Sequence, residues 1–401
     1  MRILLVCALA LAITVPAVAA GPHFVQDRFV IGFWVDPPLD DRADARYAEI
    51  AEANFTMIIG GSPGWPAEKT KQLLDLCAKY GLKAVLHVGG VSEADLPDHP
   101  ACWGYGLRDE PGAKDFPGLR EKIDAVRSLR PGRLGYINLF PTYATPEQLG
   151  CANYDEHVRR FMDEVAPDVL SMDHYPLMRP DADGRDGYCE NLEYMRTYSL
   201  QHNVPFWNFF NTMPYGNQYD PTEAQLRWQI FASLAYGAKG VLYFCYYTPI
   251  SHEFPKGGAI ITRDERRTRH YDQAKRINAA LRNLGPTLMQ LTSTGVVRIK
   301  HGDDPASRLA NTPIASITKG AYNLGLFRHA DGRRALLMMN DDHAYTSWPT
   351  VTFDTEHQDV LEVSPQTGRA EPVRDDSPDM DGLQLSFDSG EGRLFLLPAK
   401  P

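Results

Sequence analysis

The sequence has few cysteines, and their number argues against a fold held together by disulfide bridges. Six cysteines occur in 401 residues, and five of them follow position 20. An odd number this small does not make a disulfide framework. Cys77, Cys102 and Cys245 fall in apolar helix or strand patterns, whereas Cys151 and Cys189 fall in segments that resemble loops. If any pair forms a bridge, we expect it to be Cys151 with Cys189.

Basic runs, long apolar runs and cofactor motifs are also missing. The net charge is −10 without any basic cluster, which argues against a nucleic-acid partner. Beyond the first twenty residues, no segment has the roughly 18 unbroken apolar residues that a membrane span needs. No Cys/His spacing is typical of zinc, and no Gly-rich phosphate motif follows a predicted strand. We therefore expect no metal and no cofactor, and the oligomeric state stays open.

The amino terminus has the pattern of a secretory signal peptide. Arg2 precedes an apolar stretch over residues 3–15, and the small residues 17–20 end just before Gly21. The sequence predicts a signal peptide over residues 1–20 and a secreted or periplasmic protein.

Short apolar runs then alternate with longer amphipathic segments, which is typical of repeated βα units. The predicted strands are 29–35, 55–60, 83–88, 103–107, 134–139, 169–172, 205–209 and 240–246. The predicted helices are 43–53, 68–80, 119–129, 154–165, 192–201, 222–236 and 263–284. The connection 92–100 is too short for a full helix. Eight such strands predict an α/β fold, a (β/α)8 TIM barrel over residues 21–290, with a doubly wound open sheet as the alternative.

After residue 290 the apolar period changes to two. The runs 295–300, 322–328, 335–340, 350–353, 383–387 and 393–397 are separated by turns. This pattern predicts a small antiparallel β-sandwich over residues 291–401, with a structural or a carbohydrate-binding role.

Two adjacent carboxylates end the fourth predicted strand. Arg108, Asp109 and Glu110 follow its apolar residues, and Pro111 with Gly112 stops it. A carboxyl group at the mouth of a buried strand is costly to desolvate, so its presence there points to function. The structural alternative is a solvated loop that caps the next helix.

The other predicted strands also end in polar and aromatic residues. These candidates are Trp34, Asp36, Trp65, His87, Asn138, Tyr143, Asp173, His174, Tyr175, Asn208, Asn211, Tyr246 and Tyr247. Aromatic faces stack on sugar rings, and Asn, Asp and His side chains bind sugar hydroxyls, so the set predicts a carbohydrate site. Each residue alone also has a structural interpretation as core or as a partner for loop backbone.

These strand ends resemble those of clan A glycoside hydrolases, particularly the family 42 β-galactosidase type and related uncharacterised bacterial glycosidases. In that clan the fourth strand ends in Asn-Glu-Pro, which Asp109-Glu110-Pro111 matches with one change. The segments 168–176 (DVLSMDHYP) and 223–244 are similar to the clan's strand six and to its helix seven with strand eight. The resemblance covers residues 29–284, and it implies a glycosidase with a carbohydrate substrate and Glu110 as the general acid/base.

The chain departs from the clan where its nucleophile would stand, because the seventh predicted strand and its end carry no glutamate. Ser171, Asp173 and Tyr175 share one strand face by alternation, so we prefer Asp173 as the second catalytic carboxylate. Asp36 and Glu253 are competitors, and a substrate whose own 2-acetamido group attacks would need no second catalytic carboxylate. The missing glutamate favours inversion over retention.

Two other functions remain open on the sequence. The missing glutamate also fits a carbohydrate-binding barrel without catalysis. A metal-dependent hydrolase would need convergent ligands, for which His87, Asp173 and His174 are the available residues.

Overall fold

The computed structural model describes residues 23–89, 91–179, 182–250, 254 and 258–399. The predicted signal peptide and Glu253 lie outside the described residues. In the described part, none of the helices is both long and apolar enough to cross a membrane.

Eight parallel strands form the first part of the chain, and each overlaps one of the predicted runs. They are β1 (Val30–Phe33), β2 (Met57–Gly60), β3 (Lys83–His87), β4 (Cys102–Asp109), β5 (Leu134–Asn138), β6 (Leu170–Asp173), β9 (Phe206–Asn211) and β10 (Gly240–Phe244). One sheet has the order β2-β3-β4-β5, and the other has the order β1-β10-β9-β6. Single parallel bridges, Trp34 with Ile59 and Leu139 with Met172, join the two sheets at both seams. Every one of the eight strands therefore has a parallel neighbour on each side.

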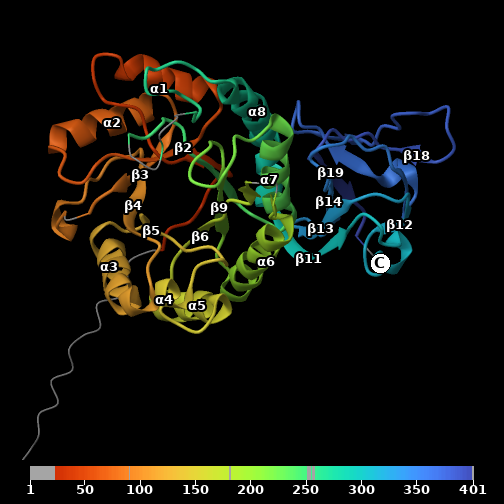
Figure 1. Ribbon diagram of the computed structural model, residues 1–401, viewed down its shortest axis with the longest axis horizontal. Coiled ribbons are helices and arrows are strands. Elements are labelled where there is room, and N and C mark those ends of the chain that lie inside the picture. The colour runs from red at the N-terminus through yellow and green to blue at the C-terminus, as the bar shows by residue number, and fades with distance from the viewer. Residues whose placement is uncertain (1–22, 90, 180–181, 251–253, 255–257, 400–401) are drawn as a thin grey trace, which may run out of the picture.

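Helices surround these strands in Figure 1. They are α1 (Ala43–Glu52), α2 (Ala67–Lys79), α3 (Phe116–Leu129), α4 (Pro146–Leu149), α5 (Tyr154–Arg160), α6 (Arg185–His202), α7 (Glu223–Ala235) and α8 (Arg269–Met289). A π-helical turn, Phe161–Val165, continues α5. The connection after β3 holds a 3-10 turn, Glu93–Asp95, in place of a long helix, as its length predicts. A two-stranded hairpin, β7 (Leu177–Met178) with β8 (Ala182–Asp183), lies before α6 and was not predicted.

Alternating side chains divide the core into two layers. One cluster gathers inward residues from six strands: Val30, Met57, Val85, Leu134, Trp207 and Leu242. The larger cluster lies between the strands and the helices. Gly240 allows this packing, since a Cβ there would lie 2.6 Å from the Trp207 ring. The carboxyl ends of the strands are thereby held as one rigid rim.

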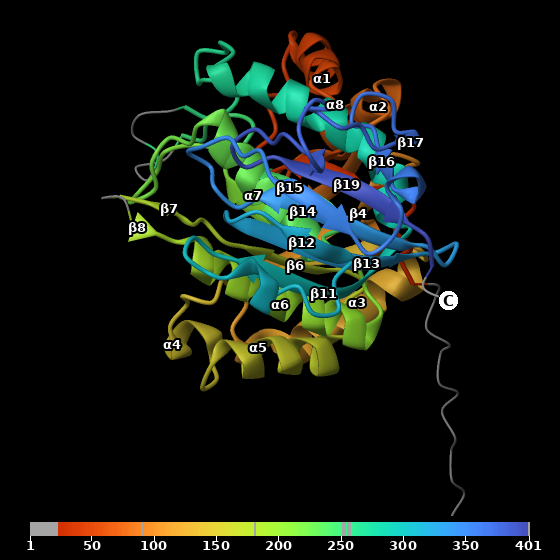
Figure 2. The same ribbon diagram turned by 90° about the vertical axis from the view of Figure 1, so that its right-hand side faces the viewer.

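The second part of the chain is antiparallel. Its strands are β11 (Leu291–Ile299), β12 (Ile314–Ile317), β13 (Tyr322–His329), β14 (Arg334–Asn340), β15 (Thr350–Phe353), β16 (Leu361–Val363), β17 (Ala370–Pro372), β18 (Leu383–Gln384) and β19 (Gly392–Leu397). A sheet of order β11-β13-β14-β19-β16-β17 and a sheet of order β12-β15-β18 share one apolar core. Figure 2 shows these sheets in front of the parallel strands.

A buried polar contact links the two parts. Asp341, at the end of β14, accepts a hydrogen bond of 2.8 Å from the Trp228 indole on α7 and pairs with Arg298 at 2.8 Å. Asp341 is only 2% exposed, so both partners offset the cost of burying its charge.

The five cysteines in the described part of the chain form no disulfide bridge. Cys151 and Cys189 are both free thiols, and Cys189 is buried within α6 where we expected a loop. The helix begins seven residues earlier than the predicted one, which places this thiol in its first turns.

Candidate active site

A cavity of about 560 Å³ opens at the carboxyl ends of the parallel strands. Its wall includes the predicted residues Trp34, His87, Arg108, Asp109, Glu110, Asn138, Asp173 and Tyr175. All eight strands, or the loops that follow them, contribute to this wall. The structure thus brings together residues that lie up to 210 positions apart in the sequence.

Glu110 reaches the cavity through an unusual backbone conformation. It has a φ of 46°, in the left-handed region that non-glycine residues rarely adopt. Its N–H donates to the Asn138 carbonyl at 2.8 Å, which holds the turn after β4. The pairing of β4 with β5 also shifts between Gly106 and Arg108. This bulge changes the side-chain alternation, so that Asp109 and Glu110 both line the cavity.

The three cavity carboxylates all bind protons more tightly than usual. Burial and the neighbouring Asp109 raise the pKa of Glu110 to about 7. Desolvation raises the pKa of Asp109, while hydrogen bonding from Asn138 and the charge of Arg108 oppose that rise. Burial, followed by the charges of Glu110 and Asp109, raises the pKa of Asp173 well above its ordinary value. At neutral pH the group therefore holds at least part of a proton that isolated carboxylates would lose.

Asn138 lies between two of these carboxylates. Its Nδ2 donates to Asp109 Oδ1 at 3.3 Å and to Asp173 Oδ1 at 3.0 Å. Because both bonds start from one nitrogen, the two acceptor oxygens lie no more than about 6 Å apart. Both amide hydrogens are engaged by the carboxylates, which leaves none for direct binding of a substrate.

Aromatic side chains line the wall contributed by β1, β6, β9 and β10. The Phe244 ring centroid lies 5.5 Å from Trp34, 5.1 Å from Tyr175 and 5.1 Å from Tyr215. The Trp34 indole N–H donates to His87 Nε2 at 2.9 Å. Burial lowers the pKa of His87, so this histidine is neutral and carries its proton on Nδ1. A cavity with carboxylates near one wall and aromatic faces on the other suits a sugar ring.

Other predicted residues lie outside this cavity. Asp36 accepts the Gly61 N–H at 3.2 Å, and burial raises its pKa to about 6. Trp65 lines a separate cavity of about 520 Å³, with Lys69 Nζ 4.3 Å from its ring. Tyr143 is half exposed and packs edge-on against His174.

His174 and the residues predicted at the ends of β9 and β10 face the helical layer. His174 binds Asn191 at 3.0 Å, and burial lowers its pKa to about 4. Asn208 donates to Tyr188 and to Ser233. We therefore assign neither His174 nor Asn208 a substrate contact.

The remaining three predicted residues are buried in the same way. Asn211 donates to the Tyr219 carbonyl, and Tyr247 donates to the Arg263 carbonyl. Tyr246 stacks on Phe33 at a centroid distance of 4.5 Å, in the outer core cluster. The Asn211 amide and the Tyr247 hydroxyl thus bond to the carbonyls of neighbouring loops, and Tyr246 contributes its ring to the core.

Tyr136, Phe209, Tyr215 and Phe244 line the cavity although the sequence reasoning did not select them. Strand alternation could have identified Phe209, because Trp207 and Phe209 lie on the inward face of β9 and Asn208 lies on the opposite face. Tyr215 lies in the loop after β9, for which strand alternation gives no signal.

The proposed metal ligands do not converge. His87 and Asp173 line the cavity, but the ring of His174 is bonded to Asn191 on the other side of β6. Within the described residues, no three His, Cys, Asp or Glu side chains are grouped to hold an ion.

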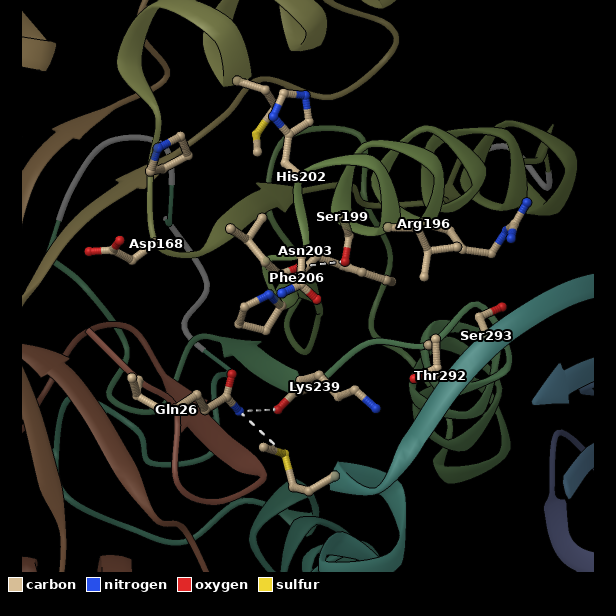
Figure 3. Close-up of a pocket in the computed structure, with 18 of the residues that line it drawn as sticks. Gln26, Asp168, Arg196, Ser199, His202, Asn203, Phe206, Lys239, Thr292 and Ser293 are labelled. Atoms are coloured by element: carbon tan, nitrogen blue, oxygen red, sulfur yellow. Dashed lines mark hydrogen bonds between the residues drawn. The ribbon is translucent and has the colours of Figure 1, made fainter. Parts of the chain in front are cut away.

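A second cavity, of about 710 Å³, lies at the opposite ends of the strands (Figure 3). Asp168 there pairs with Arg127 at 2.8 Å, and Lys239 donates to the carbonyls of Leu288 in α8 and of Leu291 in β11. Gln26 also donates to the Lys239 carbonyl at 2.7 Å. The Asp168 charge is thus paired with a cation and the Lys239 ammonium is bonded to backbone carbonyls, which indicates a structural role for these two groups.

Comparison with known proteins finds similarity in solved structures only. No family model and no curated protein matches the chain. A GH42 β-galactosidase from G. stearothermophilus superposes with a TM-score of 0.63 at 9% identity, covering 93% of this chain and 98% of that one. The β-galactosidase from Bacillus circulans sp. alkalophilus has a TM-score of 0.61 at 10% identity, covering 92% and 99%. The β-galactosidase from the psychrophilic Marinomonas ef1 has a TM-score of 0.49 at 13% identity, covering 64% of this chain and 60% of that one.

At such low identities the comparison concerns the fold alone. The similarity to GH42 enzymes extends over nearly the whole chain, so it includes the antiparallel part as well as the parallel strands. The resemblance to clan A glycoside hydrolases that the sequence indicated is therefore confirmed at the level of the fold.

Proposed function

We propose that this protein is a glycoside hydrolase, with Glu110 as the general acid. Its parallel strands would form the (β/α)8 barrel of such enzymes over residues 21–290, and residues 291–401 would form a β-sandwich. The observation that carries the proposal is Glu110 itself, a carboxyl group with a pKa of about 7 in a cavity with aromatic walls.

Cleavage of a glycosidic bond needs a proton on the departing oxygen. A carboxyl group with an ordinary pKa is almost fully ionised at pH 7, whereas Glu110 is about half protonated there. Glu110 would donate this proton as the bond from the anomeric carbon to the departing oxygen breaks.

Asp173 is the proposed partner. It lines the same cavity, on β6, and the end of β9 offers no carboxylate in its place. As a general base, Asp173 would act in its ionised form, which the hydrogen bond from Asn138 favours against the cost of burial. It would take a proton from the water that attacks the anomeric carbon, so that the product has the inverted configuration. The water supplies the hydroxyl group of the new sugar end, and Glu110 supplies the hydrogen of the leaving alcohol.

A screen of aryl glycosides and of plant or microbial oligosaccharides tests this proposal. We expect turnover by the wild type and strongly reduced turnover by Glu110→Gln and Asp173→Asn. Glu121→Gln, an exposed carboxylate on α3, is the matched control and should keep wild-type rates. NMR of the first-formed product reports its anomeric configuration, and a retained configuration would exclude Asp173 as the base.

The lack of a carboxylate on β9 also favours a second candidate, a protein that binds carbohydrate without cleaving it. Calorimetry with the same oligosaccharides separates the two functions. Binding by the wild type without any turnover across the screen would favour this candidate.

Export from the cytoplasm is part of the proposal. The signal-peptide pattern of the sequence supports it. An oligomeric or polymeric carbohydrate, the expected substrate, is consistent with a site outside the cytoplasm.

A further inference from the structure

Asn138 occupies the central position among the cavity carboxylates. It is the last residue of β5, and it stands directly opposite Asp109 of β4 in the strand pairing. Asp173 ends β6, on the other side of β5. An amide on the middle strand thus reaches a carboxylate on each neighbouring strand, at 3.3 and 3.0 Å.

A chain of buried hydroxyl groups fixes the orientation of this amide. Ser171 Oγ donates to Asn138 Oδ1 at 3.0 Å, and Ser171 is fully buried. The single Ser171 proton is used in that bond, so the Tyr136 hydroxyl, 2.9 Å away, must donate to Ser171 Oγ. Asn138 therefore presents its oxygen to Ser171 and its NH₂ group to the carboxylates.

This orientation matters because ionised carboxylates only accept hydrogen bonds. Each Asn138 hydrogen stabilises the charged form of the aspartate that it reaches. Glu110 has no such donor: within the described part of the chain, no side chain forms a hydrogen bond with its carboxyl group. Three carboxyl groups therefore share one cavity, but the Asn138 amide donates hydrogen bonds to only two of them, Asp109 and Asp173.

We infer that Asn138 is a positioning residue that stabilises the ionised forms of Asp109 and Asp173 and so shifts the shared proton toward Glu110. The inference rests on the proposed function for its consequence, since a glycosidase needs one protonated and one ionised carboxyl group in this cavity. It gives the three neighbouring acids an order of ionisation, to which the charge of Arg108 also contributes at Asp109.

Carboxyl-carbon NMR titration of protein labelled with ¹³C in Asp and Glu tests the inference without any substrate. The comparison is between wild type and Asn138→Leu, which keeps the volume and removes both donors. A hydrogen bond to a charged group corresponds to a shift of about one pH unit or more. We expect the Asp109 and Asp173 titrations to move up by at least that amount, and the Glu110 titration to move down as the proton leaves it.

Other ionisable or charged groups face these carboxylates, and the same titration must account for them. In the cavity wall they are His87 from β3, Arg108 from β4, Tyr136 from β5, and Tyr175 and Tyr215 from the following loops. Outside it, Tyr143 and Tyr154 of α5 also interact with Asp173. None of these is altered in Asn138→Leu, so their contributions cancel in the comparison.

Two further variants keep the inference open to refutation. Ser171→Ala leaves Asn138 in place but frees its amide to rotate, and it should shift the same titrations in the same direction by less. Asn208→Ala removes an equally buried amide that contacts no carboxylate, and it should leave all three titrations unchanged. The inference would be overturned if the titrations in Asn138→Leu coincided with those of the wild type. If Asn138→Leu does not fold, the same comparison is made with Ser171→Ala. Either result is independent of whether the protein cleaves glycosides.

Discussion

Replacing Glu110 with glutamine should separate the chemistry of proton donation from substrate binding. Glutamine keeps the volume of the side chain but has no acidic proton. Loss of a general acid lowers the rate by about 10² to 10⁴, which corresponds to about 3–5 kcal/mol of activation free energy. KM should change little, because the aromatic wall of Trp34, Tyr175 and Phe244 is untouched.

The effect should depend on the leaving group. A dinitrophenol departs without protonation, so Glu110→Gln should cleave its glycosides at nearly the wild-type rate. For an alkyl leaving group or a second sugar, the full loss is expected. Steady-state kinetics over a series of aryl and alkyl glycosides, with Glu121→Gln as the control, provide this comparison.

The pH dependence gives an independent measure. The wild-type kcat/KM should fall about tenfold per pH unit above pH 7, because Glu110 must be protonated and its pKa is about 7. Glu110→Gln should lack this descent. An equal loss for activated and unactivated leaving groups, or an unchanged alkaline descent in the variant, would refute the role of Glu110 as the acid.

Three further results are expected from stability and sequencing measurements. Folding raises the pKa of Glu110 from 4.5 to about 7, so its contribution to stability is complete below pH 4.5 and is lost as the pH rises through 7. Glutamine does not titrate, so the free energy of unfolding of Glu110→Gln, measured with urea, should rise relative to that of the wild type between pH 4.5 and 7. The expected rise is about 1–2 kcal/mol after allowance for solvent screening of a half-buried group. Asp341→Ala removes the acceptor of Trp228 and leaves the largely buried Arg298 with Asp186 as its remaining carboxylate partner, so it should cost about 2–3 kcal/mol in the same assay. A loss below 1 kcal/mol would contradict that account. Amino-terminal sequencing of protein from an exporting host should begin near Gly21, and an intact amino terminus on soluble cytoplasmic protein would argue against export.

The residues around β9 show why sequence patterns assign strands more readily than faces. Phe206, Trp207, Phe209 and Phe210 are all apolar, so both faces of the strand are buried and the pattern of hydrophobicity does not tell them apart. The strand was correctly predicted, but Asn208 was placed on the cavity side when its amide faces Tyr188 and Ser233. A one-residue difference in register moves a side chain from one face to the other.

The carboxylate pair shows the opposite case. Asp109 and Glu110 follow an apolar run and precede a proline and a glycine, which was enough to mark the strand end and its functional importance. Simple alternation would put the two on opposite faces. The β-bulge after Gly106 and the left-handed conformation of Glu110 turn both toward one cavity, and neither feature has a distinctive local pattern here.

The sequence alone determined the order of strands and helices, the change from parallel to antiparallel structure near residue 290, and the strand end that carries the acids. These follow from local spacing, because burial of one face or of both faces imposes a period on the chain. The tertiary structure alone decided which strand-end residues meet. The contact of Asn138 with Asp109 and Asp173 depends on three strands standing side by side, and the aromatic wall depends on Trp34 and Phe244, 210 positions apart, packing together. Such contacts are set by register and closure among distant segments, since no local period encodes the distance between them.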